Sequence, residues 1–183
     1  MATYKKIKHV LYPDSTITLA LYSGLESCKD LRKSVMEGTV VASLLKPSMI
    51  VDPFQVLTAA NKAVHLSRTN NMTTKNVHSE ILFCLSPSKN ISESFRSFGA
   101  ADSDTSVFVA IVDDAEDKTL TRISEILGLS PVSIDDVASL ADTVLITKAY
   151  KLSEEEISTY PILDALVSRI AAKEIITAGK GKN

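Results

Sequence analysis

The side chains best suited to bind a charged ligand gather in one stretch, residues 53–68. At helical spacing, one half of this stretch is polar and carries no carboxylate along its body. An ordinary solvated helix mixes charges of both signs and gains from acid–base pairs four residues apart. A face of cations and hydrogen-bond donors instead suits a ligand that bears phosphate, with a plain solvated face as the alternative. The residues that favour binding are Asn61, Lys62, His65 and Arg68, with Lys75 just beyond them.

Local signals position that face. Asp52 is a good N-cap, and Pro53 suits the first helical position, where no amide partner is lost. Apolar residues occupy the other half of the helical wheel, so we expect them in the core, and the polar half also takes up Phe54, Gln55 and Thr58. The apolar residues are Val56, Leu57, Ala59, Ala60, Ala63, Val64 and Leu66.

No set of residues predicts catalysis. The sequence contains no Walker loop, no Gly-rich dinucleotide turn and no zinc spacing, and His9, His65 and His78 are far apart along it. Cys28 and Cys84 have no recognisable base nearby and are expected to be reduced thiols, a disulfide being the less favoured alternative. We therefore predict no catalytic residue and no metal site.

The acidic residues at 113–119 are the other candidate for a metal site. Their spacing lacks the alternating oxygen ligands of a calcium loop, so a solvated acidic loop is the favoured interpretation.

Composition limits the function classes. The 183 residues fit one domain, and 45% hydrophobic with 23% charged residues is typical of a globular protein. A net charge of −2 argues against wrapping nucleic acid non-specifically, so any such contact must be local. The apolar runs are too short for a membrane span, and no signal peptide is recognisable at the N-terminus, so we expect no membrane association.

The elements alternate without a regular βαβ order, which predicts an α+β (irregular α/β) fold with a mixed sheet in a single domain over 1–176. A flexible tail is expected at 177–183. A long C-terminal helix is expected from Ser153 to about Ile176, disturbed at Pro161. Strands are expected at Lys6–Tyr12, Thr16–Tyr22, Val107–Val112 and Val144–Tyr150, and helices at Ser27–Gly38 and Leu120–Leu127.

The last helix carries an apolar stripe, which is either ordinary core or a face that docks on a partner. We expect its middle to supply the anchors if it docks. The stripe consists of Ile162, Leu163, Leu166, Val167 and Ile170.

Several motifs together resemble the TPRKB family, the PRPK-binding subunits of the KEOPS (EKC) complex. The similarity covers about residues 7–176, and the block at 51–66 is its most specific part. The other motifs are Met36-Glu37-Gly38-Thr39, Ser79-Glu80-Ile81-Leu82-Phe83, Leu85-Ser86-Pro87, Asn90-Ile91-Ser92-Glu93, Phe98-Gly99 and Tyr150-Lys151-Leu152-Ser153.

The resemblance implies a non-catalytic subunit without a cofactor, which docks on a PRPK-type atypical kinase/ATPase and modulates it. It also implies binding to the 3′ CCA end of tRNA and support for threonylcarbamoyladenosine formation at tRNA position 37. Further partners would be the other KEOPS/EKC subunits, including the threonylcarbamoyl transferase, in the cytoplasm and nucleus. A free-standing enzyme that binds a phosphate ligand on the face of helix 53–68 is the alternative.

Combined with the residue pattern, the resemblance assigns two sites. We expect Asn61, Lys62, His65, Arg68 and Lys75 to face tRNA. We expect Leu163, Leu166, Val167 and Ile170 to bind the kinase.

Overall fold

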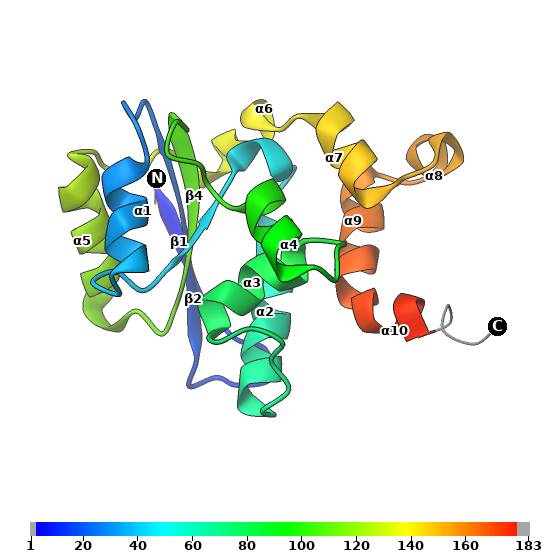
Figure 1. Ribbon diagram of the computed structural model, residues 1–183, viewed down its shortest axis with the longest axis horizontal. Coiled ribbons are helices and arrows are strands. Elements are labelled where there is room, and N and C mark those ends of the chain that lie inside the picture. Colours follow the sequence, from blue (N-terminus) through cyan, green and yellow to red (C-terminus); the bar gives the residue numbers. More distant parts are fainter. Residues whose placement is uncertain (1–2, 179–183) are drawn as a thin grey trace.

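The computed structural model describes residues 3–178, with the side chains of residues 3–175 (Figure 1). A four-stranded sheet stands at its centre in the order β1-β2-β4-β3. Each neighbouring pair of strands is antiparallel, so the predicted α+β class is confirmed while the sheet is antiparallel rather than mixed. The strands are β1 (Tyr4–Lys8), β2 (Thr16–Ser23), β3 (Ser43–Leu45) and β4 (Ser106–Val112).

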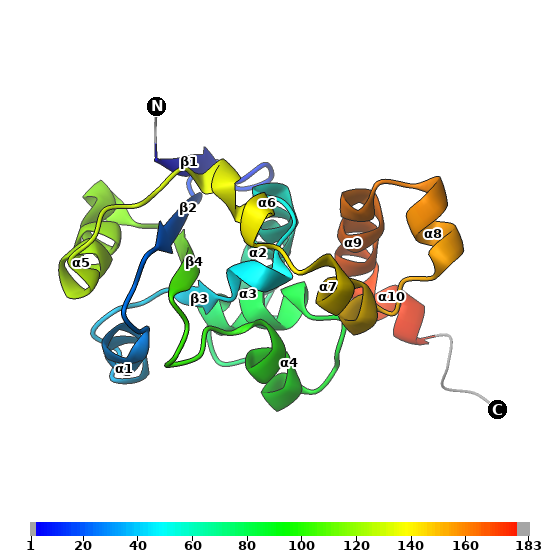
Figure 2. The same cartoon turned by 90° about the horizontal axis from the view of Figure 1, so that it is seen from above.

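Helices cover both faces of the sheet, as Figure 2 shows from above. On one side lie α1 and α5, and on the other α2 and α3, with α4 beside α3. Beyond α2 lie the short helices α7 to α10, on the side away from α1 and α5. The helices are α1 (Lys29–Met36), α2 (Pro53–Arg68), α3 (Val77–Leu85), α4 (Ile91–Phe98), α5 (Lys118–Leu127), α6 (Val137–Leu140), α7 (Thr143–Tyr150), α8 (Glu154–Thr159), α9 (Ile162–Ala171) and α10 (Lys173–Ala178).

The central strand β4 explains why two separate cores form. Successive side chains of a strand point to opposite faces, so an unbroken apolar run is buried on both sides. Val107 and Val109 pack against α1 and α5, while Phe108 and Ala110 pack against α2, α3 and the outer helices. The predicted strand at 107–112 is confirmed.

Two predicted elements at the C-terminal side are wrong. Residues 144–150 form α7 rather than a strand, because Asp142 caps the helix at Leu145 N and Ile146 and Tyr150 share its buried side. The predicted long last helix is three helices. Pro161 is the N-cap of α9, and Ala172 separates α9 from α10.

The last described element crosses the residue at which the sequence prediction places the end of the domain. Helix α10 continues to Ala178, past the boundary predicted at 176, and residues 179–183 of the predicted tail lie outside the described residues. None of the described helices is long and apolar enough to span a membrane.

The carboxylates of the acidic loop bind neighbouring elements of the fold. Asp114 is buried and accepts hydrogen bonds from the amides of Thr119 and Leu120 at the start of α5. Asp117 forms an ion pair with Lys6 on β1. Among the described residues, no cluster of histidine, cysteine, aspartate and glutamate is arranged to hold a metal ion.

Candidate interaction surfaces

The N-terminus of α2 forms as its sequence predicts. The Asp52 carboxylate accepts a hydrogen bond from Phe54 N at 2.8 Å, and Pro53 occupies the first turn. The apolar half of the helix lies against the sheet and α3. The predicted helix over 53–68 is therefore confirmed residue for residue.

The polar half of α2, however, is not one exposed face. Gln55 is fully buried, where its side-chain amide donates to Met49 O and accepts from Val51 N. Phe54 is instead half exposed. Helix α9 packs along this side of α2, which the wheel of a single helix cannot show.

Lys62 contradicts the prediction of a cation that faces solvent without acidic partners. Its ammonium donates to Ile170 O at 2.7 Å and pairs with Glu174 at 2.5 Å, and only 15% of the side chain is exposed. Because the carbonyls at the end of a helix lack partners, a cation there is favourable. Lys62 therefore caps α9 and holds α10.

Asn61 is half-buried, and the group that it contributes to a hydrogen bond is its backbone carbonyl. Its carbonyl accepts a hydrogen bond from His9 Nε2 at 2.9 Å. The Nδ1 atom of His9 accepts from the amides of Leu11 and Tyr12, which assigns the ring proton to Nε2. The Asn61 Oδ1 atom is buried without a hydrogen-bond partner in the described part of the chain.

The other end of α2 brings together side chains that are distant in sequence. Tyr12, in the turn between β1 and β2, hydrogen-bonds through its hydroxyl to His65 Nδ1 at 2.9 Å. The Arg68 guanidinium lies 5.4 Å from the centre of the Tyr12 ring. The centre of the His9 ring lies 4.9 Å from the centre of the same Tyr12 ring. We call Tyr12, His65 and Arg68 the aromatic–basic cluster. Tyr12 was not among the residues expected from the sequence to face tRNA, although its position next to Pro13 indicates a turn.

One acid moderates this cluster. Asp14 pairs with Arg68 at 2.7 Å, and the hydrogen bond from Arg68 lowers the pKa of the Asp14 carboxyl. The same hydrogen bond to Asp14 raises the pKa of Arg68. Lys75 is exposed and forms no ion pair with any described residue. Arg68 and Lys75 are therefore the accessible cations among the predicted tRNA residues.

The apolar stripe of the last helix belongs mostly to the core. Leu166 and Ile170 are 0% and 1% exposed in the cluster that contains α2 and α7. The prediction that these two side chains dock on a partner is therefore wrong, because they are already buried in the core of their own domain. Leu163 and Val167 are half-buried.

In contrast to α9, the neighbouring helices α7 and α8 expose several apolar side chains. Val144 and Leu145 of α7 are 79% and 45% exposed, and Ile157 and Tyr160 at α8 are 41% and 60% exposed. A groove runs between α7 and the α8–α9 pair, with Leu152 and Ile162 in its lining. Lys148 and Lys151 stand at its edge and form no ion pair with a described residue. We call this surface the α7–α8 surface.

The two thiols are inert at neutral pH. Cys28 and Cys84 are both buried and unpaired, as expected. Burial raises the pKa of Cys28 to about 11 and that of Cys84 to about 12, so both stay protonated.

Comparison with known proteins gives a consistent match. Residues 22–174 match the family model described as kinase binding protein CGI-121. The chain is 40% identical over 168 residues to the EKC/KEOPS complex subunit TPRKB of Danio rerio, which covers 90% of this chain and 95% of that protein. It is 33% identical over 144 residues to the EKC/KEOPS complex subunit cgi121 of Aspergillus fumigatus, covering 74% and 76% of the two chains.

Proposed function

The chain belongs to the CGI-121 family of kinase-binding proteins, and we propose that it is a non-catalytic subunit of a KEOPS/EKC complex. In this role it binds and modulates a PRPK-type kinase/ATPase and holds tRNA by its 3′ CCA end. It thereby supports threonylcarbamoyladenosine formation at tRNA position 37. The names of the relatives support this proposal, and the buried, protonated thiols offer no cysteine nucleophile.

The exposed apolar side chains of the α7–α8 surface carry the proposal for the kinase contact. Apolar residues this exposed are costly to leave in water, and the centres of protein interfaces are apolar with a polar rim. Val144 and Ile157 supply the centre, and Lys148 and Lys151 supply a rim that favours acidic residues on the kinase. The docking face thus lies beside the predicted stripe on α9.

A charge placed at the centre of this surface tests the kinase contact. We expect Val144→Glu to abolish co-purification with the kinase while the chain stays folded, because the side chain is 79% exposed. Val10→Glu is the matched control, since Val10 is 81% exposed in the β1–β2 turn, which is not part of the α7–α8 surface. Wild-type co-purification of Val144→Glu and of Ile157→Glu would overturn this assignment.

A second observation, the aromatic–basic cluster, favours tRNA as a ligand. Single-stranded RNA ends are bound by aromatic and guanidinium planes on which bases stack, together with cations that neutralise phosphates. Tyr12 and His65 offer two nearly parallel rings whose centres lie 6.1 Å apart, and Arg68 and Lys75 offer the charge. Lys62 drops out of this proposal because it caps α9.

Two opposite charge changes test the RNA contact. Arg68→Gln should weaken binding of tRNA and reduce the slope of log affinity against log salt by about 0.7, the contribution of one phosphate contact on a single strand. Asp14→Asn should tighten binding, because it removes the acid that pairs with Arg68. Unchanged affinity in both variants would reject the cluster, and equal binding of a tRNA without its CCA end would reject the 3′ end as its target.

An activity assay distinguishes the non-catalytic subunit from the alternative, a free-standing enzyme. The purified chain should hydrolyse no ATP by itself and should change the rate of the kinase when the two are mixed. Hydrolysis by the chain alone would revive a free-standing enzyme that uses a phosphate ligand.

A further inference from the structure

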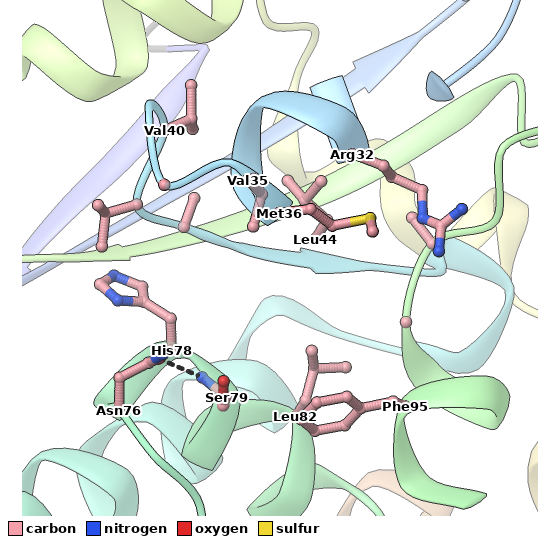
Figure 3. A pocket seen from close by; sticks show the side chains of 15 residues that line it. Arg32, Val35, Met36, Val40, Leu44, Asn76, His78, Ser79, Leu82 and Phe95 are labelled. Carbon is pink, nitrogen blue, oxygen red and sulfur yellow. Dashed lines mark hydrogen bonds between the residues drawn. The ribbon is translucent and has the colours of Figure 1, made fainter. Parts of the chain in front are cut away.

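A cavity of about 360 Å³ lies between α1, β3, α3 and α4, apart from both surfaces described above (Figure 3). This volume falls within the range of sites that hold small molecules. Leu82 and Phe95 form one wall, and Val35 and Met36 face them across the cavity. No residue of the aromatic–basic cluster or of the α7–α8 surface lines it.

One end of the cavity is lined by hydrogen-bond donors at the start of α3. Asn76 caps this nine-residue helix by accepting from Ser79 N at 2.9 Å, which leaves the Asn76 amino group pointing away from its own helix bond. Neither that amino group nor the Ser79 hydroxyl hydrogen-bonds to another described residue. The first turn of a helix also carries amides without intrahelical partners and a positive dipole end.

His78, which also lines the cavity, adds a further donor at the same end. The residue is only 8% exposed, and its Nε2 atom accepts a hydrogen bond from Val112 N at 3.1 Å. Burial lowers the pKa of His78 to about 4, so the ring is neutral at pH 7 and its proton lies on Nδ1. Nδ1 donates to no other described residue and remains accessible, so it is free to donate to a ligand in the cavity that His78 lines.

The lining of the cavity offers hydrogen-bond donors and no carboxylate to occupy them, which favours a ligand with a hydrogen-bond acceptor. No aspartate or glutamate lines it. Asp113 acts on His78 from nearby, but its carboxylate already accepts from Ser15 Oγ and Thr16 N. Arg32, at the other end of the cavity in Figure 3, is paired with Asp102. No unpaired arginine is therefore available for the bidentate contact that phosphate recognition favours.

We propose that this cavity binds a small apolar carboxylic acid. The carboxylate accepts hydrogen bonds from His78 Nδ1 and the donors at the start of α3, where the helix dipole favours an anion. The apolar body lies between Leu82 and Phe95 on one side and Val35 and Met36 on the other. Met36 is 81% exposed, and its flexible side chain can pack over a bound ligand.

The first test uses 4-phenylbutyrate as the probe and its neutral amide as the matched control ligand. We expect saturable one-to-one binding that shifts the NMR signals of the Met36 methyl group and of the His78 ring nitrogens. The amide should bind about tenfold more weakly, because hydrogen bonds to a charged acceptor are stronger. Absence of saturable shifts at these two residues, or equal affinity for the amide, would overturn the proposal.

The second test blocks the mouth of the cavity at an exposed position. Met36→Trp should weaken 4-phenylbutyrate binding at least tenfold and leave co-purification with the kinase intact. Val144→Trp is the matched control, because Val144 is 79% exposed on a different helix, and it should bind the probe as the wild type does. Wild-type affinity in Met36→Trp, or an equal loss in both variants, would overturn the site.

Discussion

Lys62 shows how a charged residue on a polar helix face can serve the fold. Its spacing along α2 is that of a solvent-facing cation, and its sequence neighbours contain no acid to pair with it. The partners are instead supplied from more than a hundred residues away, by the last carbonyls of α9 and by Glu174 of α10. Sequence spacing therefore identified the side chain but not its partner.

Removing this cation should lower stability. We expect Lys62→Met to reduce the free energy of unfolding by about 1–2 kcal/mol, because a helix-end cation and its charge-assisted hydrogen bonds are lost together. Lys118→Met is the control, since Lys118 pairs with Glu116 while both are about three-quarters exposed. Exposed pairs contribute about 0–1 kcal/mol. Urea unfolding measures the difference, and equal losses in the two variants would contradict the capping role.

His78 makes stability depend on pH. Its folded pKa of about 4 lies below the unfolded value of 6.5, so the unfolded chain binds more protons between these values. Stability should therefore fall as pH drops from about 6.5 to 4, by roughly 3 kcal/mol at most. Unfolding free energies measured across this range should be flatter in His78→Gln. A parallel decline in both proteins would exclude His78 as the cause.

At the level of elements, the well-predicted helices and strands carry their own local signals. Helix α2 has its Asp52 cap and Pro53, and α5 ends at Gly128 in the left-handed conformation. Helix α7 was misassigned because Val144, Ile146 and Thr147 are β-branched, a feature typical of strands. The Asp142 cap and the four-residue spacing of Ile146 and Tyr150 were the competing signals, and burial of these two side chains in the core favoured the helix.

The C-terminal helices depend on tertiary partners more than on propensity. Each is short, and isolated helices of this length are marginal in water. Arg169 of α9 binds both carboxylate oxygens of Glu156 on α8, at 2.7 and 2.8 Å. Leu166 and Ile170 attach α9 to the core. The break at Ala172 has no strong local signal, and Lys62 stabilises it from outside.

This packing predicts a clear contrast within the last helices. Leu166→Ala should reduce the free energy of unfolding by about 2–5 kcal/mol, the usual cost of removing a fully buried leucine side chain. Val144→Ala, at a 79% exposed position on α7, should change it by less than about 0.5 kcal/mol. Thermal and urea unfolding measure both. A stable Leu166→Ala protein that has lost the kinase would restore α9 as the docking helix.

For the whole molecule, the class of fold and its central strand could be predicted from local patterns. The order of the strands and the packing of α9 against α2 could not, because both join segments that are distant in sequence. The same limit applies to the candidate sites. His65 and Arg68 were found from helical spacing, whereas Tyr12 reaches them only because the β1–β2 turn folds back onto the end of α2. The exposure of Val144 could not be predicted, because the sequence indicated a strand at 144–150.

The arrangement of the two proposed surfaces makes a last prediction. The α7–α8 surface and the β1–β2 turn lie on different sides of the molecule (Figures 1 and 2), so kinase and tRNA should bind the same chain together. Val144→Glu should lose the kinase and keep the tRNA affinity of the isolated chain, and Arg68→Gln should do the reverse. Because distant sites without shared partners act additively, the double variant should show both losses unchanged. A pull-down of labelled tRNA with and without the kinase measures this. Competition between the two ligands would show that their surfaces overlap.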